Sequence, residues 1–212
     1  MNQKIISSSE NFILKYAPKS IFLASSGATY EKGIKQNEHT CYGKLKVEQE
    51  ERVALASKIG ESVLTVCRIF NLSGRHISKS STFALANFFS SAKQNLRIEI
   101  NSCFPVFRRY CLDEEIVELA LNLMSQGESH AFDSGGYKVE LRDLAILVAE
   151  LVGKEIQLEF PEIDHSIPAS NYFSTSNKYE ELLEKNLGRK PASIAIQLKE
   201  TYEGMLENEQ LN

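Results

Sequence analysis

Apolar positions in the first third of the chain follow two alternating patterns. Residues 20–25 ("SIFLAS") and 62–70 ("SVLTVCRIF") are short continuous apolar runs, which are typical of strands buried on both faces of a parallel sheet. The segment 9–17 before the first run carries apolar residues at helical spacing, and the residues that flank about 41–58 predict a second helix there. An order of helix, strand, helix and strand predicts a parallel α/β sheet.

Residues at the ends of these segments support the predicted boundaries. Ser9 and Thr40 stand where helix N-caps are expected, and Pro18 ends the first helix. Gly60 follows the second helix at the place where a left-handed residue commonly ends a helix.

The remainder of the chain mixes shorter elements. The pattern predicts helices over 81–95, 113–127 and 140–152, strands over 97–101 and 156–160, a short strand before the Gly-Gly turn, a polar loop over 161–176, and two terminal helices divided at "LGRKP". Such a series is typical of a smaller α+β lobe packed on the edge of the sheet.

Composition excludes several classes of function. Hydrophobic residues make up 42% and charged residues 25% of the 212 positions, as in ordinary globular proteins. A net charge of −4 gives no basis for binding nucleic acid through its phosphates. No apolar run approaches the ~20 residues of a membrane span, and the N-terminus shows no signal peptide. The four cysteines form no C-x-x-C pair, which predicts reduced thiols in a cytoplasmic protein rather than a metal site.

A tyrosine and a lysine four residues apart are the first candidates for chemistry. Tyr42 and Lys46 would share one helix face, where the ammonium would stabilise a phenolate and favour general acid/base work. In a chain with 8 tyrosines this spacing arises by chance nearly as often as not, and alone it fits an exposed helix pair better. Ser26 strengthens the case because it ends a predicted strand, at the sheet edge where open α/β folds bind ligands. The alternative for Ser26 is a turn serine that bonds its own backbone.

Five blocks follow one another along the chain and together cover nearly all of it: "SSGATY", "YGKLK", "RIFNLSGR", "FRRYCLDEEIVELAL" and "LGRKPASIAIQLKETYEGM". In this order they resemble the NAD-dependent epimerase/dehydratase family of the extended short-chain dehydrogenase/reductase superfamily. The family patterns are S-S-x-A-V-Y-G, Y-x-x-x-K, R-x-F-N-x-x-G and R-D-[YF]-x-x-V-D-D. The resemblance implies the C-terminal part of a Rossmann-like parallel sheet with a smaller α+β substrate lobe. It also implies that residues 1–78 are a partial NAD-binding domain and that 79–212 are mainly the substrate lobe, with elements returning to the sheet.

The resemblance also implies roles for individual residues. Ser26, Tyr42 and Lys46 would form the catalytic centre, with Lys46 on the nicotinamide ribose. Further roles fall on seven positions in all: Ser25, Tyr42, Lys46 and Phe70 for the cofactor, and Ser26, Asn71 and Arg108 for a nucleotide-diphosphate sugar. The implied cofactor is NAD, with NADP left open. For Arg108 the alternative is a surface arginine, although guanidinium favours bidentate phosphate contacts.

Departures from the family pattern define the open alternatives. None of the 11 glycines forms G-x-G-x-x-G, and only 25 residues precede Ser26 where several βαβ units are expected. We therefore expect an N-terminally truncated member that binds NAD weakly or not at all by itself. Ser26, Gly27 and Ala28 stand where the dehydratases have T-D-E, which favours epimerase or reductase chemistry over loss of water.

Three readings of the function follow. In the first, the chain is an NAD-dependent nucleotide-sugar epimerase or reductase. In the second, it is an inactive remnant or one subunit of a split enzyme that needs a complementing chain, because missing strands would leave an exposed sheet edge. In the third, it is a scaffold that kept only the fold. The resemblance also implies a homodimer through the helix that carries Tyr42 and its neighbour.

Overall fold

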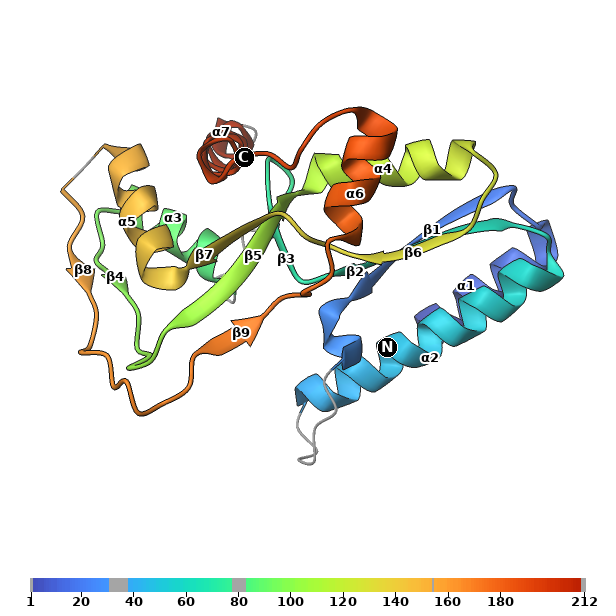
Figure 1. The fold of residues 1–212 in the computed structure, drawn as a ribbon, viewed down its shortest axis with the longest axis horizontal. Coiled ribbons are helices and arrows are strands. Elements are labelled where there is room, and N and C mark those ends of the chain that lie inside the picture. Colours follow the sequence, from blue (N-terminus) through green and yellow to red (C-terminus); the bar gives the residue numbers. More distant parts are fainter. Residues whose placement is uncertain (1, 31–37, 78–82, 154, 211–212) are drawn as a thin grey trace. The chain divides into compact units, whose positions relative to one another are not determined.

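A computed structural model describes the chain except for residues 1, 31–37, 78–82, 154 and 211–212 (Figure 1). The chain divides into two compact units that each take residues from several segments. Unit 1 comprises Met1–Phe70, Ile116–Ser134 and Ser174–Lys190, and unit 2 comprises Asn71–Glu115, Gly135–Phe173 and Pro191–Asn212. Among the described helices, none is both long and apolar enough to cross a bilayer.

Unit 1 is built on a parallel sheet. Its strands β1 (Ser20–Ser26), β2 (Val63–Ile69) and β6 (His130–Asp133) lie in the order β1-β2-β6. The predicted strands at 20–25 and 62–70 are thus confirmed as β1 and β2. A short 3-10 helix, η1 (Gly27–Tyr30), follows β1.

Helices lie on both faces of this sheet (Figure 1). On one face lie α1 (Asn2–Tyr16) and α2 (Glu38–Ile59), which bury an apolar cluster against the strands. The members of that cluster are Ile13, Leu23, Val53, Ala56, Leu64 and Val66. The other face holds α6 (Lys178–Leu187) and α4 (Asp113–Ser125), of which residues from Ile116 onward belong to this unit. There the ring of Phe132 stacks on Tyr179, with centroids 6.3 Å apart.

Unit 2 has β5 (Val106–Leu112) as its central strand. The strands β3 (Asn71–Ser73) and β9 (Ser170–Tyr172) pair with it in parallel, and β7 (Tyr137–Glu140) pairs antiparallel. A separate parallel pair joins β4 (Ile98–Glu99) to β8 (Leu158–Glu159). This mixture of parallel and antiparallel pairing is the α+β arrangement expected for the second part of the chain.

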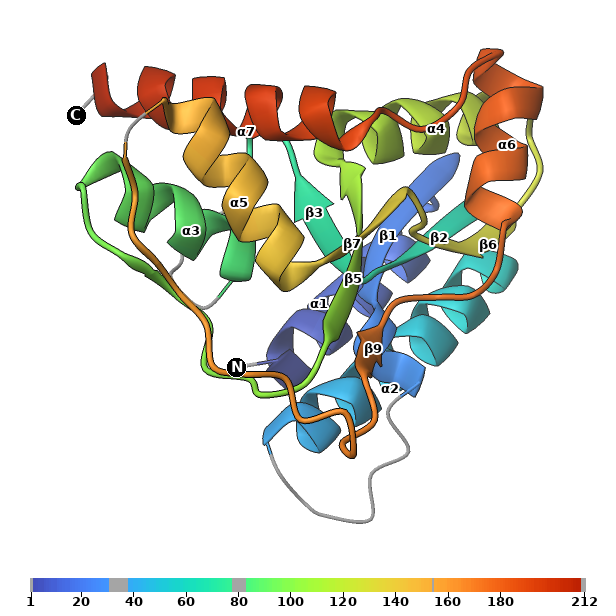
Figure 2. The same cartoon turned by 60° about the vertical axis from the view of Figure 1, so that its left-hand side comes forward.

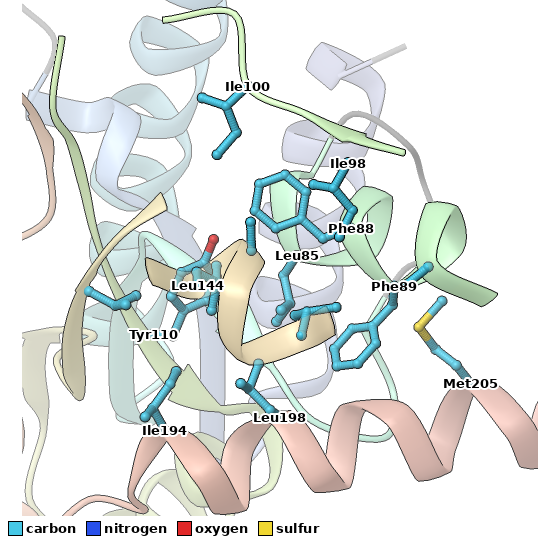
Figure 3. Close-up of a cluster of buried hydrophobic side chains, with 14 residues drawn as sticks. Leu85, Phe88, Phe89, Ile98, Ile100, Tyr110, Leu144, Ile194, Leu198 and Met205 are labelled. Atoms are coloured by element: carbon cyan, nitrogen blue, oxygen red, sulfur yellow. The ribbon is translucent and has the colours of Figure 1, made fainter. Parts of the chain in front are cut away.

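Three helices supply the core of unit 2: α3 (Ala84–Lys93), α5 (Leu141–Val152) and α7 (Ile194–Gln210) (Figure 2). Their apolar side chains converge in one cluster with residues of β4 and β5 (Figure 3). It includes Leu85, Phe88, Phe89, Ile98, Ile100, Tyr110, Leu144, Ile194, Leu198 and Met205. As expected, α5 ends at Gly153, which has a left-handed φ of 71°.

Several predicted details were wrong. Helix α1 begins at Asn2 instead of near Ser9, and the Ser9 hydroxyl donates to the carbonyl of Ile5 (2.9 Å) within the helix. Helix α2 begins at Glu38, so Thr40 lies inside it and does not cap it. The left-handed residue after α2 is Glu61 (φ 52°), not Gly60.

Four strands of unit 2 were not predicted as strands. Two arginines interrupt the apolar pattern of β5, while β3 and β9 have only 3 residues each and β7 only 4. Segments this short carry too little periodicity to be recognised, and the pairing with β5 holds them in place.

Candidate active site

Ser26 lies where β1 ends and η1 begins, at the carboxyl end of the parallel sheet of unit 1. Its Oγ accepts a hydrogen bond from the amide of Ala28 (3.2 Å), and its carbonyl accepts one from Thr29 Oγ1 (2.9 Å). These bonds are those of a turn serine, and they also hold the half-buried hydroxyl at the edge where α/β sheets bind ligands.

Two glycines allow the backbone to approach closely at this edge. A Cβ on Gly43 would lie 2.3 Å from the carbonyl oxygen of Ala28, so α2 packs directly on η1 at this point. A Cβ on Gly27 would lie 2.4 Å from the ring of Phe70. Gly43 follows Tyr42 in the chain, and its contact with η1 therefore brings the start of α2 beside the end of β1.

Tyr42 and Lys46 lie on one face of α2, as their spacing predicts. Lys46 Nζ is 5.9 Å from the centroid of the Tyr42 ring, and Tyr42 is 40% exposed. The ammonium of Lys46 donates to the carbonyl of Ala24 and to Gln49 Oε1, both at 3.0 Å. Among the described residues, these bonds leave one ammonium hydrogen without a protein acceptor.

Burial also changes the pKa of Lys46. Loss of solvation lowers the pKa of Lys46 below its ordinary value, and the nearby carboxylate of Glu50 partly opposes this. A half-buried ammonium with a donor to spare suits a ligand hydroxyl.

Ser25 belongs to a charged network that was not predicted from the sequence. Its side chain is buried, and its Oγ donates to Glu50 Oε1 at 2.5 Å. Arg68 donates to the same carboxylate from Nε (3.0 and 3.1 Å) and from Nη2 (2.6 Å). Asp133 Oδ1 lies 3.7 Å from Arg68 Nη1 and accepts a hydrogen bond from Tyr30 Oη at 3.0 Å. The hydroxyl of Ser25 is thus committed to Glu50, and its predicted cofactor role stays a prediction.

Phe70 lies in the same region of unit 1, next to η1. Its ring lies against Gly27 and stacks on Tyr30, with centroids 6.2 Å apart and planes 16° apart. Burial, followed by the hydrogen bond to Asp133, raises the pKa of Tyr30 above its ordinary value. Unit 1 therefore gathers Ser25, Ser26, Tyr42, Lys46 and Phe70 around the end of β1 and the adjoining part of α2.

The two remaining predicted residues lie in unit 2. Asn71 Nδ2 donates to the carbonyls of Arg109 (3.3 Å) and Tyr172 (3.2 Å), so the amide holds β3 near β5 and β9. Arg108 is half-buried on β5, donates from Nη1 to the Phe107 carbonyl (2.8 Å) and lies over the Tyr172 ring at 5.8 Å.

Arg108 is a half-buried cation. Burial lowers the pKa of its guanidinium, and its partners among the described residues are the Phe107 carbonyl and the Tyr172 ring, not a carboxylate. A half-buried cation without a counter-ion is costly unless a ligand supplies the charge. The described residues contain no cluster of His, Cys, Asp and Glu that could hold a metal ion.

Comparison with known proteins shows which solved structures share this fold. No protein-family model and no curated protein sequence matches the chain. A solved UDP-glucose 4-epimerase of Thermotoga maritima, with UDP-glucose, is similar at 19% identity and a TM-score of 0.72, covering 98% of this chain and 72% of that one. UDP-N-acetylglucosamine 4-epimerase of Methanobrevibacter ruminantium is similar at 17% identity and a TM-score of 0.74, covering 98% and 70%. UDP-glucuronic acid 4-epimerase of Bacillus cereus, in complex with UDP-glucuronic acid and NAD, reaches a TM-score of 0.74 at 12% identity, covering 100% and 68%.

These structures agree with the resemblance seen in the sequence blocks. The chain has the same fold as these UDP-sugar 4-epimerases.

Proposed function

We propose that this chain carries the proton-transfer centre and the diphosphate site of an NAD-dependent nucleotide-sugar epimerase or reductase. One observation carries the proposal: Lys46 binds the Ala24 carbonyl at the end of β1 (3.0 Å), with Tyr42 one helical turn before it. This bond, together with the contact of Gly43 on η1, holds the Tyr-Lys pair beside the strand that ends in Ser26. The solved structures support it, because these proteins of the same fold are UDP-sugar 4-epimerases.

Each residue of the centre has a role suited to its surroundings. Tyr42 is exposed enough to reach a sugar hydroxyl, and it would take up and return that hydroxyl's proton. Ser26 would orient the same hydroxyl through its Oγ. Lys46 would hold the nicotinamide ribose with its remaining donor. NAD, when bound, would supply a hydride acceptor and donor.

The fit to NAD is limited to one end of the cofactor. Lys46, Tyr42 and Phe70 suit the nicotinamide end, while the 11 glycines form no phosphate-binding fingerprint. We therefore propose that NAD binds this chain weakly by itself. NADP is equally compatible, because the residues that distinguish the two cofactors contact the adenosine ribose.

The substrate we propose is a nucleotide-diphosphate sugar. Arg108 would provide bidentate contacts to the diphosphate and thereby gain the counter-charge that it lacks among the described residues. Asn71 would contribute through its Oδ1, since its amide nitrogen is already bonded to two carbonyls. Gly27 and Ala28 supply no carboxylate next to Ser26, which favours epimerase or reductase chemistry over dehydration. The four cysteines are free thiols, which is consistent with a cytoplasmic site of action.

A single-turnover assay tests this function. The chain in excess over UDP-glucose, with millimolar NAD, is expected to form the C4 epimer slowly, and Tyr42→Phe is expected to reduce the rate by about 10²–10⁴-fold. Tyr16→Phe, at an exposed position on α1, is the matched control and should leave the rate unchanged. Conversion that survives Tyr42→Phe would contradict the assignment.

A second candidate is one subunit of a split enzyme, and the free edge of β1 favours it. β1 is the last strand in the order β1-β2-β6, and no described strand pairs with its other edge. In addition, Ala24 is exposed on one face of β1, although parallel sheets are normally covered on both faces. A complementing chain with a Gly-rich βαβ unit would cover this edge and supply the missing phosphate site. Co-purification that restores micromolar NAD affinity would support this candidate.

We propose a homodimer that forms through α2, which carries Tyr42, and its neighbour α1. On α1, Ile5, Phe12 and Tyr16 form an apolar stripe, each at least 50% exposed. Sedimentation should therefore show association that depends on concentration and that Phe12→Glu weakens.

A further inference from the structure

The carboxylate of Glu50 joins three elements of unit 1. Glu50 lies on α2, one turn beyond Lys46, and its side chain is only 15% exposed. It accepts the short hydrogen bond from Ser25 on β1 and the paired donors of Arg68 on β2. A residue of this kind fixes the position of a helix against two strands.

Glu50 and Lys46 together hold consecutive residues of β1. Lys46 Nζ binds the Ala24 carbonyl, and Glu50 binds the hydroxyl of the next residue, Ser25. The residue after that is Ser26. Because the two helix residues are one turn apart, their contacts set both the position of α2 along β1 and its distance from the strand.

We propose that Glu50 is a positioning residue of this centre: it holds Lys46 and the end of β1 in the relative geometry that Ser26, Tyr42 and Lys46 require. The inference rests on the proposed function, since it assigns Glu50 a part in a centre whose chemistry is itself proposed.

A plain structural ion pair with Arg68 is the competing explanation, and it makes a different prediction. If Glu50 served only to neutralise Arg68, replacing both residues would remove both charges and leave the site intact. If Glu50 positions Lys46, the surroundings of Lys46 change whenever Glu50 is replaced, with or without Arg68. Within the described part of the chain, Glu50 is the charged group that acts on Lys46, and the hydrogen-bond partners of Lys46 are Gln49 and the Ala24 carbonyl.

The test uses the full chain labelled with ¹³C-lysine, in which the Lys46 signal is assigned by Lys46→Arg. Glu50→Gln, Arg68→Met, the double variant and the exposed control Glu51→Gln are compared by thermal unfolding and by the pH titration of that signal. Glu50→Gln and Arg68→Met are each expected to lower the melting temperature, and the double variant is expected to recover most of the loss. The Lys46 pKa is expected to fall further in both variants that lack Glu50, while Glu51→Gln leaves it unchanged.

Two results would overturn the proposal: a Lys46 titration unaltered by Glu50→Gln, or a double variant in which both the melting temperature and the Lys46 titration return to those of the parent. Should Glu50→Gln fail to fold, the double variant supplies the titration, because it leaves neither charge unpaired. The readout needs neither NAD nor sugar nucleotide. A parent chain that binds no UDP-glucose would therefore refute the proposed function, and the Lys46 titration would still test the role of Glu50.

Discussion

The contact between Gly43 and the carbonyl oxygen of Ala28 sets how close α2 comes to the end of β1. Replacing Gly43 with alanine would place a Cβ 2.3 Å from that oxygen, whereas ordinary contacts begin at 3.4 Å. Both partners are fixed to the main chain, so neither can rotate away. The helix or η1 would have to move by about 1 Å to relieve the overlap, against the close packing of the interior.

The expected cost follows from two opposing effects. Overpacking of this kind costs about 1–3 kcal/mol, and alanine recovers about 1 kcal/mol relative to glycine in a helix. The two effects leave a net loss of up to about 2 kcal/mol in the free energy of unfolding, which corresponds to a fall of up to roughly 8 °C in melting temperature for a chain of this size. A displacement of about 1 Å at Tyr42 would also lower the rate of the proposed reaction by on the order of 10²-fold.

Thermal and urea unfolding of Gly43→Ala, followed by circular dichroism, measure the first effect. Lys44→Ala is the control, because Lys44 is exposed on the same turn and its replacement introduces no contact. If Gly43→Ala is more stable than the parent chain by the full ~1 kcal/mol that alanine gains over glycine in a helix, the close approach of α2 to η1 is refuted, and with it the argument that places Tyr42 beside Ser26.

Three further predictions concern backbone strain, cofactor and pH. Glu61 has a left-handed φ of 52°, so Glu61→Gly should raise the free energy of unfolding by roughly 0.5–1 kcal/mol in urea titrations, and a loss of stability would contradict the strain. Calorimetry of the chain with NAD should show no binding in the micromolar range, and a micromolar dissociation constant would contradict the partial cofactor site. The pKa of Lys46 is lowered in the folded state, so the folded chain releases this proton at a lower pH than the unfolded chain does. The free energy of unfolding of the parent, relative to Lys46→Met, should therefore rise with pH as the pH approaches the ordinary lysine value of 10.5 from below. A relative stability that stays flat or falls over this range would contradict the burial of Lys46.

The strands of unit 1 could be predicted from the sequence because their side chains are apolar on both faces. The runs 20–25 and 62–70 are nearly continuous in apolar residues. Leu64, Val66 and Cys67 of β2 are all buried, whereas β1 buries Leu23 and Ser25 and leaves Ala24 exposed. β5 escaped prediction for the opposite reason, because Arg108 and Arg109 lie within the strand, and the latter bonds the Gly136 carbonyl through Nε (3.1 Å). The strand is recognisable only once its partners β3, β7 and β9 are in place.

The candidate site divides in the same way. Tyr42 and Lys46 are four residues apart on one helix, and local geometry is sufficient to pair them. The network of Glu50 with Ser25 and Arg68 joins residues 25 and 18 positions apart, and Asp133 is farther still. Only the pairing of β2 with β1 and β6 brings these charges together, so no spacing in the sequence predicts the network. The one local signal was the position of Glu50, a single turn beyond Lys46.

Binding of UDP-glucose to the chain in the absence of NAD is the most direct test of the central claim, that this chain holds a nucleotide-diphosphate sugar for a Ser-Tyr-Lys centre. Isothermal calorimetry should detect binding to the parent chain, and Arg108→Gln should weaken it by at least about tenfold, since a charge-assisted contact to phosphate contributes roughly 1.5–3 kcal/mol. Arg97→Gln, which removes an arginine that is half exposed and paired with Glu99, should leave the affinity unchanged. Equal affinity in the parent and in Arg108→Gln, or no binding by the parent at all, would contradict the claim.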